Sequence, residues 1–188
     1  MLAKSTLTLA IFTWMAASAL AQQVTLPLPR LLTVMPMGGQ AGTTVEVTIT
    51  GENTENISEL MFSTPKITAK PVAGVENKFT VNIAADAPVG VYDARVMSRL
   101  GVSAARAFSV NKLPEVIRTK ANNSVETAMA LPLGTICNAT MTKRSVDFYA
   151  FQGEKGKRVA VDCAATGIDS RLTPVLILAD AKGGDLKV

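Results

Sequence analysis

The sequence predicts an all-β protein built of two consecutive β-sandwich modules. From Gln22 onward, hydrophobic residues recur at every second position, the spacing of half-buried strands. Turn-forming clusters rich in glycine, asparagine and proline separate these runs at short intervals, which is typical of antiparallel sandwiches. A polar stretch at 112–122 divides the runs into two groups, and the 188 residues with 48% hydrophobic content suffice for two small domains.

Residues 1–21 have the pattern of a secretory signal peptide. A short segment with Lys4 precedes an apolar stretch, and small residues follow up to Ala21. The apolar stretch contains threonines and is shorter than the roughly 20 residues that a membrane-spanning helix needs. We therefore expect cleavage between Ala21 and Gln22, no stable membrane insertion afterwards, and export to the periplasm, the cell surface or the medium.

The first module is expected at 22–111. Its strands include "TVEVTIT", "KFTVNI" and "VYDARV", and turn signals such as "MGGQAG" and "DAPVG" lie between them. Alternation assigns to the buried faces Val45, Val47 and Ile49, then Phe79, Val81 and Ile83, then Tyr92, Ala94 and Val96.

A linker is expected at 112–122, because Pro114 and the run "RTKANNS" favour an irregular chain. The following segment "NNSVETAMAL" predicts a single helical turn. Asn123 would cap it, with Glu126 three residues later.

The second module is expected at 123–188, with strands at "TICNATM", "SVDFYAF", "RVAVDC" and "PVLILAD". The second and third of these flank the polar, double-glycine segment "QGEKGK". The pattern predicts a β-hairpin over 145–163 whose charges lie on the turn and the outer face.

The charge pattern argues against several functional classes. The net charge of +4 is spread over scattered residues without interleaved aromatics, so no nucleic-acid surface is expected. The chain has no histidine, which removes the usual Ser-His-Asp and Cys-His systems within it. Carboxylates such as Asp162 and Asp169 form no recognisable acid–base pair, and we expect no catalytic residue.

The two cysteines, Cys137 and Cys163, allow two interpretations. Export and an even count favour a disulfide, which would close a loop of about 27 residues and contribute ~3 kcal/mol. Alternatively, both are free thiols packed as small hydrophobic side chains.

Residues 29–110 resemble an IPT/TIG-type immunoglobulin-like domain. The shared features are Pro36 with "GGQAGT", a strand that ends in Gly51, Phe62 after a polar loop, and the late run "APVGVY" followed by "R", "G", "S" and "F.V".

Residues 115–188 resemble the first half of a bacterial pre-peptidase C-terminal (PPC) domain, a jelly-roll-like sandwich. The resemblance lies in "NNSVETAMAL", in the pattern of Asp147, Tyr149 and Phe151, in the "G…V.VD" strand and in "DSRLTPVLILADAKGGDL". This module order resembles large exported proteins of planctomycete-type bacteria. It implies further strands beyond Val188, so we expect an N-terminal fragment of a longer polypeptide.

The second resemblance also implies a weak calcium site. Related collagen-binding domains bind calcium through acidic residues near the domain start, where this chain has "TKANNS". The oxygen ligands that remain for calcium are Asn122, Asn123 and Asp147. No other cofactor is expected.

Two functional hypotheses follow. In the first, the chain is a non-catalytic exported binding or spacer module. Its partner would be an extracellular matrix protein, a polysaccharide or its own downstream domains. In the alternative, it is the accessory region of a secreted peptidase whose catalytic domain lies beyond residue 188.

Overall fold

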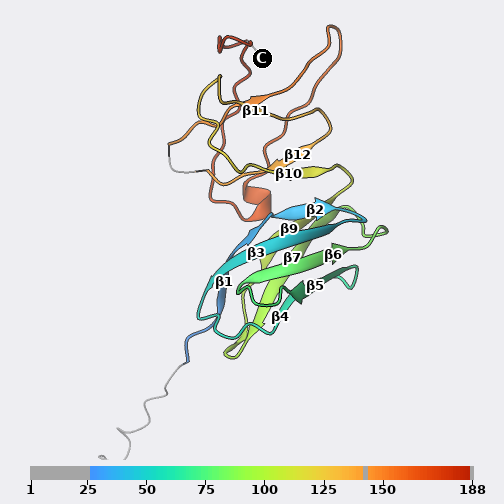
Figure 1. Ribbon diagram of the computed structural model, residues 1–188, viewed down its shortest axis with the longest axis vertical. Coiled ribbons are helices and arrows are strands. Elements are labelled where there is room, and N and C mark those ends of the chain that lie inside the picture. The colour runs from blue at the N-terminus through green and yellow to red at the C-terminus, as the bar shows by residue number, and fades with distance from the viewer. Residues whose placement is uncertain (1–25, 142–143, 187–188) are drawn as a thin grey trace, which may run out of the picture.

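The computed structural model describes residues 26–141 and 144–186, and it is nearly all β (Figure 1). The predicted all-β fold class is therefore confirmed. The expected signal peptide and its cleavage pair, Ala21 and Gln22, lie outside the described residues. Within the described part of the chain, no helix has the length and apolar character needed to cross a membrane.

The first module, residues 30–111, is a sandwich of two sheets. The first sheet has the order β1 (Arg30–Met35), β3 (Thr44–Glu52), β6 (Lys78–Ile83) and β5 (Ile67–Pro71), all antiparallel. The second has the order β2 (Gly38–Gln40), β9 (Arg106–Asn111), β7 (Gly90–Ser98) and β4 (Glu59–Phe62). The short strand β8 (Gly101–Val102) pairs with the end of β7, and β2 runs parallel to β9.

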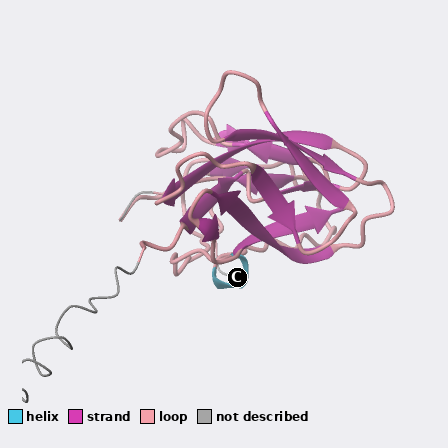
Figure 2. Cartoon of the chain, turned by 90° about the horizontal axis from the view of Figure 1, so that it is seen from below, coloured by secondary structure: helices cyan, strands magenta, loops and turns pink. Residues whose placement is uncertain are grey.

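The core lies between these sheets, which face each other as two layers (Figure 2). The inward positions predicted from alternation in β3, β6 and β7 are buried or half-buried. The rings of Phe62 and Phe108 meet edge to face, with centroids 5.0 Å apart. Every second side chain of each strand points inward and packs against the opposite sheet, so the two sheets enclose the core.

The predicted turn "MGGQAG" contains a strand instead. Its residues Gly38–Gln40 form β2, and a Cβ added at Gly39 would lie 2.6 Å from Cδ1 of Ile83. The turn itself begins afterwards, where Gly42 has a φ of 82° and its amide donates to the carbonyl of Ile83. Glycine is needed at Gly39 for close approach and at Gly42 for the left-handed backbone.

The second module, residues 112–186, contains only short elements. Strand β10 (Glu115–Ile117) runs parallel to β12 (Ile136–Asn138), and β11 (Met129–Ala130) runs parallel to β13 (Tyr149–Ala150). A single 3₁₀ turn, η2 (Thr166–Ile168), lies against β9 at the boundary with the first module (Figure 1). Strand β10 lies inside the predicted linker 112–122, where these three residues pair with β12.

Three other local predictions for this module need correction. The expected helical turn after Asn123 is a hydrogen-bonded turn, in which the amide of Thr127 donates to the carbonyl of Ser124. The predicted strands "RVAVDC" and "PVLILAD" are absent, apart from one antiparallel bridge between Ala179 and Asp185.

The predicted hairpin over 145–163 was also wrong. Its central turn exists, since the amide of Lys157 donates to the carbonyl of Glu154 at 3.1 Å. No ladder joins the arms, and β13 is the only strand within them. The alternating hydrophobic residues have no sheet to pack against, so Val146 and Val161 remain exposed, and an unsupported two-stranded hairpin is marginal in water.

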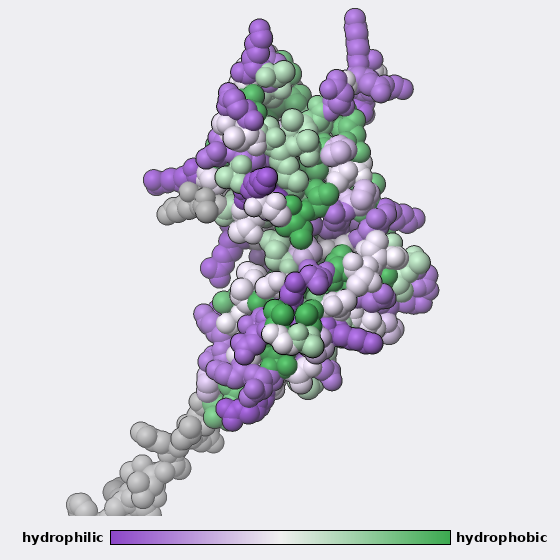
Figure 3. Space-filling model, in the orientation of Figure 1, coloured by the Kyte–Doolittle hydropathy of each residue, from purple (hydrophilic) through white to green (hydrophobic). Residues whose placement is uncertain are grey.

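Exposed aliphatic side chains distinguish the second module from the first. Among its described residues, Ala165 is the only buried hydrophobic one. Figure 3 shows hydrophobic residues on the surface of this upper module. Four consecutive ones form what we term the aliphatic run, with exposed fractions of 82% for Val175, 57% for Leu176, 67% for Ile177 and 39% for Leu178.

Candidate functional site

The guanidinium of Arg118 is the centre of a polar cluster in the second module. It follows β10, and its Nη1 donates to Oδ1 of Asn122 at 3.2 Å. Its Nη2 donates to the carbonyl of Thr140, and its Nε lies 3.3 Å from Oδ2 of Asp147. The Asp147 side chain is only 7% exposed, so this ion pair is shielded from water.

Asn122 connects the cluster to the segment before β13. Its backbone carbonyl accepts from the amide of Phe148 at 2.7 Å, and its Nδ2 donates to the carbonyl of Phe148, also at 2.7 Å. The Arg118–Asp147 contact is within ion-pair distance but outside hydrogen-bonding geometry, so Nε and Oδ2 have no hydrogen-bond partner. The cluster thus relies on charge and on the amide of Asn122.

The structure brings together two of the three predicted calcium ligands. Asn122 and Asp147 both face Arg118, whereas Asn123 is exposed. Calcium requires six to eight oxygen ligands. The side-chain oxygens of Asn122 and Asp147 do not fit calcium as arranged, because the guanidinium of Arg118 already lies against them. The described residues also contain no group of three or more His, Cys, Asp or Glu side chains suited to a metal ion. Calcium binding remains a prediction, and it would require the Arg118 side chain to move away from Asn122 and Asp147.

Both cysteines are free thiols in the structure, which corresponds to the second of the two interpretations. The Sγ of Cys137 lies 3.9 Å from the Sδ of Met129 and 3.8 Å from the carbonyl oxygen of Asn138. Burial raises the pKa of the Cys137 thiol, and it raises the pKa of Tyr149 to about 12. Both groups are therefore neutral at physiological pH, which disfavours a nucleophilic role.

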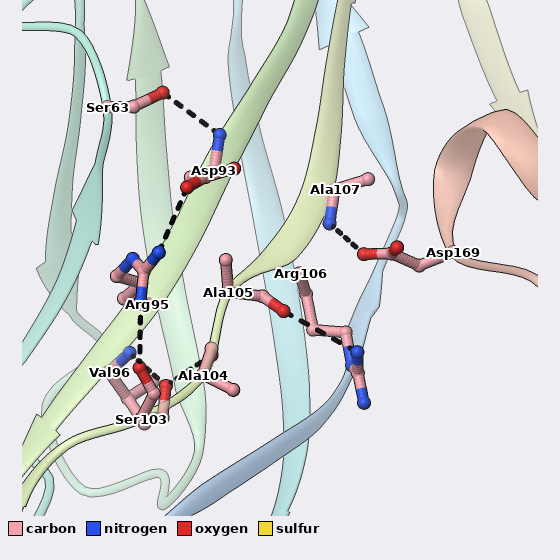
Figure 4. Close-up of polar contacts among 10 residues, drawn as sticks. All are labelled: Ser63, Asp93, Arg95, Val96, Ser103, Ala104, Ala105, Arg106, Ala107 and Asp169. Carbon is pink, nitrogen blue, oxygen red and sulfur yellow. Dashed lines mark hydrogen bonds and ion pairs between the residues drawn. The ribbon is translucent and has the colours of Figure 1, made fainter.

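Two side chains of the second module accept hydrogen bonds from main-chain amides of the first. The amide of Met37 donates to Oδ1 of Asn138 at 3.1 Å. The amide of Ala107, in β9, donates to Oδ2 of Asp169 at 2.7 Å (Figure 4). Asp169 follows η2 with a φ of 61°, a left-handed conformation that aspartate tolerates, and this places its carboxylate at the boundary.

A second polar group in Figure 4 belongs to the first module, with Asp93 and Arg95 on the outer face and Ser103 buried. Arg95 donates to Oδ2 of Asp93 at 3.1 Å and to the carbonyl of Ser103 at 3.3 Å. The amide of Asp93 donates to Oγ of Ser63, and the amide of Val96 donates to Oγ of Ser103. These contacts tie β4, β7 and the β8–β9 loop together, which is a structural role.

The intermodule cleft is a hollow of about 500 Å³ between the two modules. It is lined by Met35, Pro36, Gly38, Val45, Glu46, Thr48, Lys78, Glu115, Ile117 and Asn138. Clefts at domain boundaries are common places for ligands to bind.

Glu115 carries the charge on the second module's side of this cleft. Its Oε2 accepts from Nδ2 of Asn138 at 2.6 Å, and its Oε1 accepts from Nδ2 of Asn111 at 3.5 Å. Burial raises the pKa of the Glu115 carboxyl, and the two amides oppose this rise in part. On the other wall, Nζ of Lys78 lies 2.6 Å from Oε2 of Glu46.

Sequence reasoning did not single out Glu115, Arg118, Asn138 or the role of Asp169. Glu115 and Arg118 lie in "EVIR", where two charges flank two β-branched residues, and this was the available signal for a strand with a polar function. Nothing local could pair Asn138 with Met37, because 101 positions separate them.

Comparison with protein-family models finds no match to the chain, and comparison with curated proteins finds none either.

The buried ion pair gives a stability prediction. Replacing Arg118 with methionine leaves Asp147 uncompensated and should cost about 3–5 kcal/mol of unfolding free energy in the second module. Arg30→Met is the matched control, because Arg30 and Glu52 are both more than half exposed, and it should cost less than about 1 kcal/mol.

Urea unfolding followed at backbone amide signals of each module provides the measurement. The double variant Arg118→Met/Asp147→Leu should recover part of the loss, since it removes the unpaired charge. Equal losses from Arg118→Met and Arg30→Met would contradict the central role of Arg118.

Glu115 gives a pH prediction. Its pKa in the folded protein is raised above 4.5, so the folded state holds this proton to higher pH than the unfolded state. Its contribution to stability is therefore fully present below pH 4.5 and is lost as pH rises through the raised pKa. Glu115→Gln keeps an acceptor for Asn138 and removes this titration. The free energy of unfolding of wild type minus that of Glu115→Gln should decrease as the pH is raised from about 4 to about 7, as measured by urea unfolding. A difference that increases with pH would contradict the burial of this carboxyl.

Proposed function

We propose that the chain is a non-catalytic exported module that acts as a spacer and binds a partner, and that it forms the N-terminal part of a larger secreted or cell-surface protein. The observation that carries the proposal is the contrast between its two modules. The first is a closed sandwich, while the second is fixed to one end of it and exposes the aliphatic run.

Support for spacing comes from the boundary between the modules. They are stacked end to end (Figure 1), and the bonds from Met37 to Asn138 and from Ala107 to Asp169 are provided by different segments. A third bond from Nε2 of Gln40 to the carbonyl of Lys112 fixes the start of the second module. Several bonds across one boundary restrict bending, which is what a spacer requires.

Support for binding comes from Val175 to Leu178. Neighbouring residues in an extended chain point to opposite sides, and here both sides are exposed. No backbone hydrogen bond is found for Val175, Leu176 or Ile177 within the described residues. Such a segment lacks hydrogen-bond partners for its backbone and apolar side chains packed against its own. An added polypeptide strand supplies both. Among the candidate partners, this favours a protein or a downstream segment over a polysaccharide.

The two resemblances are consistent with this proposal. In the first module, Oη of Tyr92 donates to the carbonyl of Pro88 at 2.7 Å, a contact of the type found in tyrosine corners of immunoglobulin-like sandwiches. In the second, the Asp147 and Tyr149 pattern supplies the buried partner of Arg118 and strand β13. We propose an IPT/TIG-type module followed by part of a PPC-type module.

Hydrogen exchange on two forms of the protein tests the proposal. One form is the native polypeptide isolated from the exterior of its source cells, and the other is recombinant 22–188. Amides of Val175–Leu178 should exchange slowly in the native form, because a strand pairs with them, and rapidly in the recombinant form. Amides of Val47 and Val81 serve as the internal control and should be equally protected in both.

The same native sample should begin at Gln22. A native chain found in the cytoplasm with an intact Met1 would overturn export. Rapid exchange of Val175–Leu178 in the exported native protein would overturn strand binding at the aliphatic run.

A further inference from the structure

The intermodule cleft has an uncompensated negative charge. Three ionisable side chains line it, and two of them, Glu46 and Lys78, form an ion pair at 2.6 Å. The third, Glu115, accepts hydrogen bonds only from the neutral amides of Asn138 and Asn111. No lysine or arginine of the described residues lies within ion-pair distance of Glu115.

This charge is held in a defined place. Glu115 is half-buried, and Asn138, which orients its carboxylate, is itself fixed by the amide of Met37 in the first module. The carboxylate therefore does not swing freely into solvent as a surface side chain does. A cation that reached it would meet a preoriented acceptor at reduced entropic cost.

The rest of the lining is suited to an aliphatic arm. Met35 and Pro36 contribute apolar surface from the first module, and Ile117 lies two positions after Glu115, on the same side of β10. Ile117 is 45% exposed, so this surface is free to be covered. Lysine and arginine side chains bury their methylene groups along apolar walls while the charged head meets a polar partner.

We propose that the intermodule cleft binds a basic side chain of a partner polypeptide, with Glu115 as its counter-ion. The aliphatic stem packs against Met35, Pro36 and Ile117, while Glu46 and Lys78 already neutralise each other in the cleft. This goes beyond the proposed function, because the cleft lies at the module boundary and does not depend on what covers Val175–Leu178.

A titration with a small probe tests this directly. The probe is N-acetyl-lysine N-methylamide, added to isotopically labelled 22–188 while amide NMR shifts are recorded. Saturable shifts are expected at Thr48, Lys78, Glu115 and Ile117, with a dissociation constant of about 1 mM or weaker, since a single ion pair and a few methylenes are involved. Raising the salt concentration should weaken binding through screening.

The neutral probe N-acetyl-norleucine N-methylamide is the matched ligand control and should bind at least about tenfold more weakly. Glu115→Gln should weaken binding of the lysine probe by a similar factor, corresponding to about 1.4 kcal/mol of binding free energy. Asp93→Asn is the matched protein control, since Asp93 lies on the outer face of the first module. It should leave the shifts unchanged.

A second variant keeps the proposal testable if Glu115→Gln disturbs the module boundary. Ile117→Arg places a cation of the chain itself beside Glu115 and should abolish the shifts caused by the lysine probe. The proposal is overturned if the norleucine probe binds as well as the lysine probe, if Ile117→Arg leaves binding intact, or if wild type shows no saturable shift in the cleft.

Discussion

The amide of Ala107 lies on the side of β9 that faces β2, like the amide of Ser109, which donates to the carbonyl of Met37. Because β2 begins only at Gly38, paired with Ser109, it leaves Ala107 without a strand partner on that side. The carboxylate of Asp169 takes this position, 62 residues further along the chain. The second module is thus attached to a main-chain donor that the first module leaves open, and we expect its order to depend on this attachment.

The dependence follows from the distribution of hydrophobic burial. The first module buries a continuous cluster from both sheets, which can offset the ~1–2 kcal/mol that ordering the backbone of each residue costs. The second module has no comparable cluster within its described residues. Its order comes from the bonds of Arg118, from short parallel strand pairs and from contact with the first module. A hydrogen bond contributes only about 1 kcal/mol net, so these interactions must act together.

The same distribution explains which features could be predicted from the sequence. Alternation of hydrophobic residues was sufficient to predict the buried faces of β3, β6 and β7, because each of these strands packs against a core. Alternation at 145–163 was equally clear, yet the arms do not pair, because a period of two describes which residues could be buried and not whether a covering surface exists. The candidate site was harder still. Asn122 and Asp147 were expected together, but their partner Arg118 and the contacts across the boundary join segments distant in sequence, and no local pattern encodes those.

The dependence of the second module on the boundary is tested most directly by hydrogen exchange in 22–188 with Asp169→Ala. We expect faster exchange at three amides far from the substitution in sequence, those of Arg118, Ile136 and Phe148, which donate to the carbonyls of Asn138, Pro114 and Asn122. The amide of Val81 in the first module should keep its protection. If Arg118, Ile136 and Phe148 exchange as slowly as in wild type, the second module is ordered without this attachment and does not depend on the boundary.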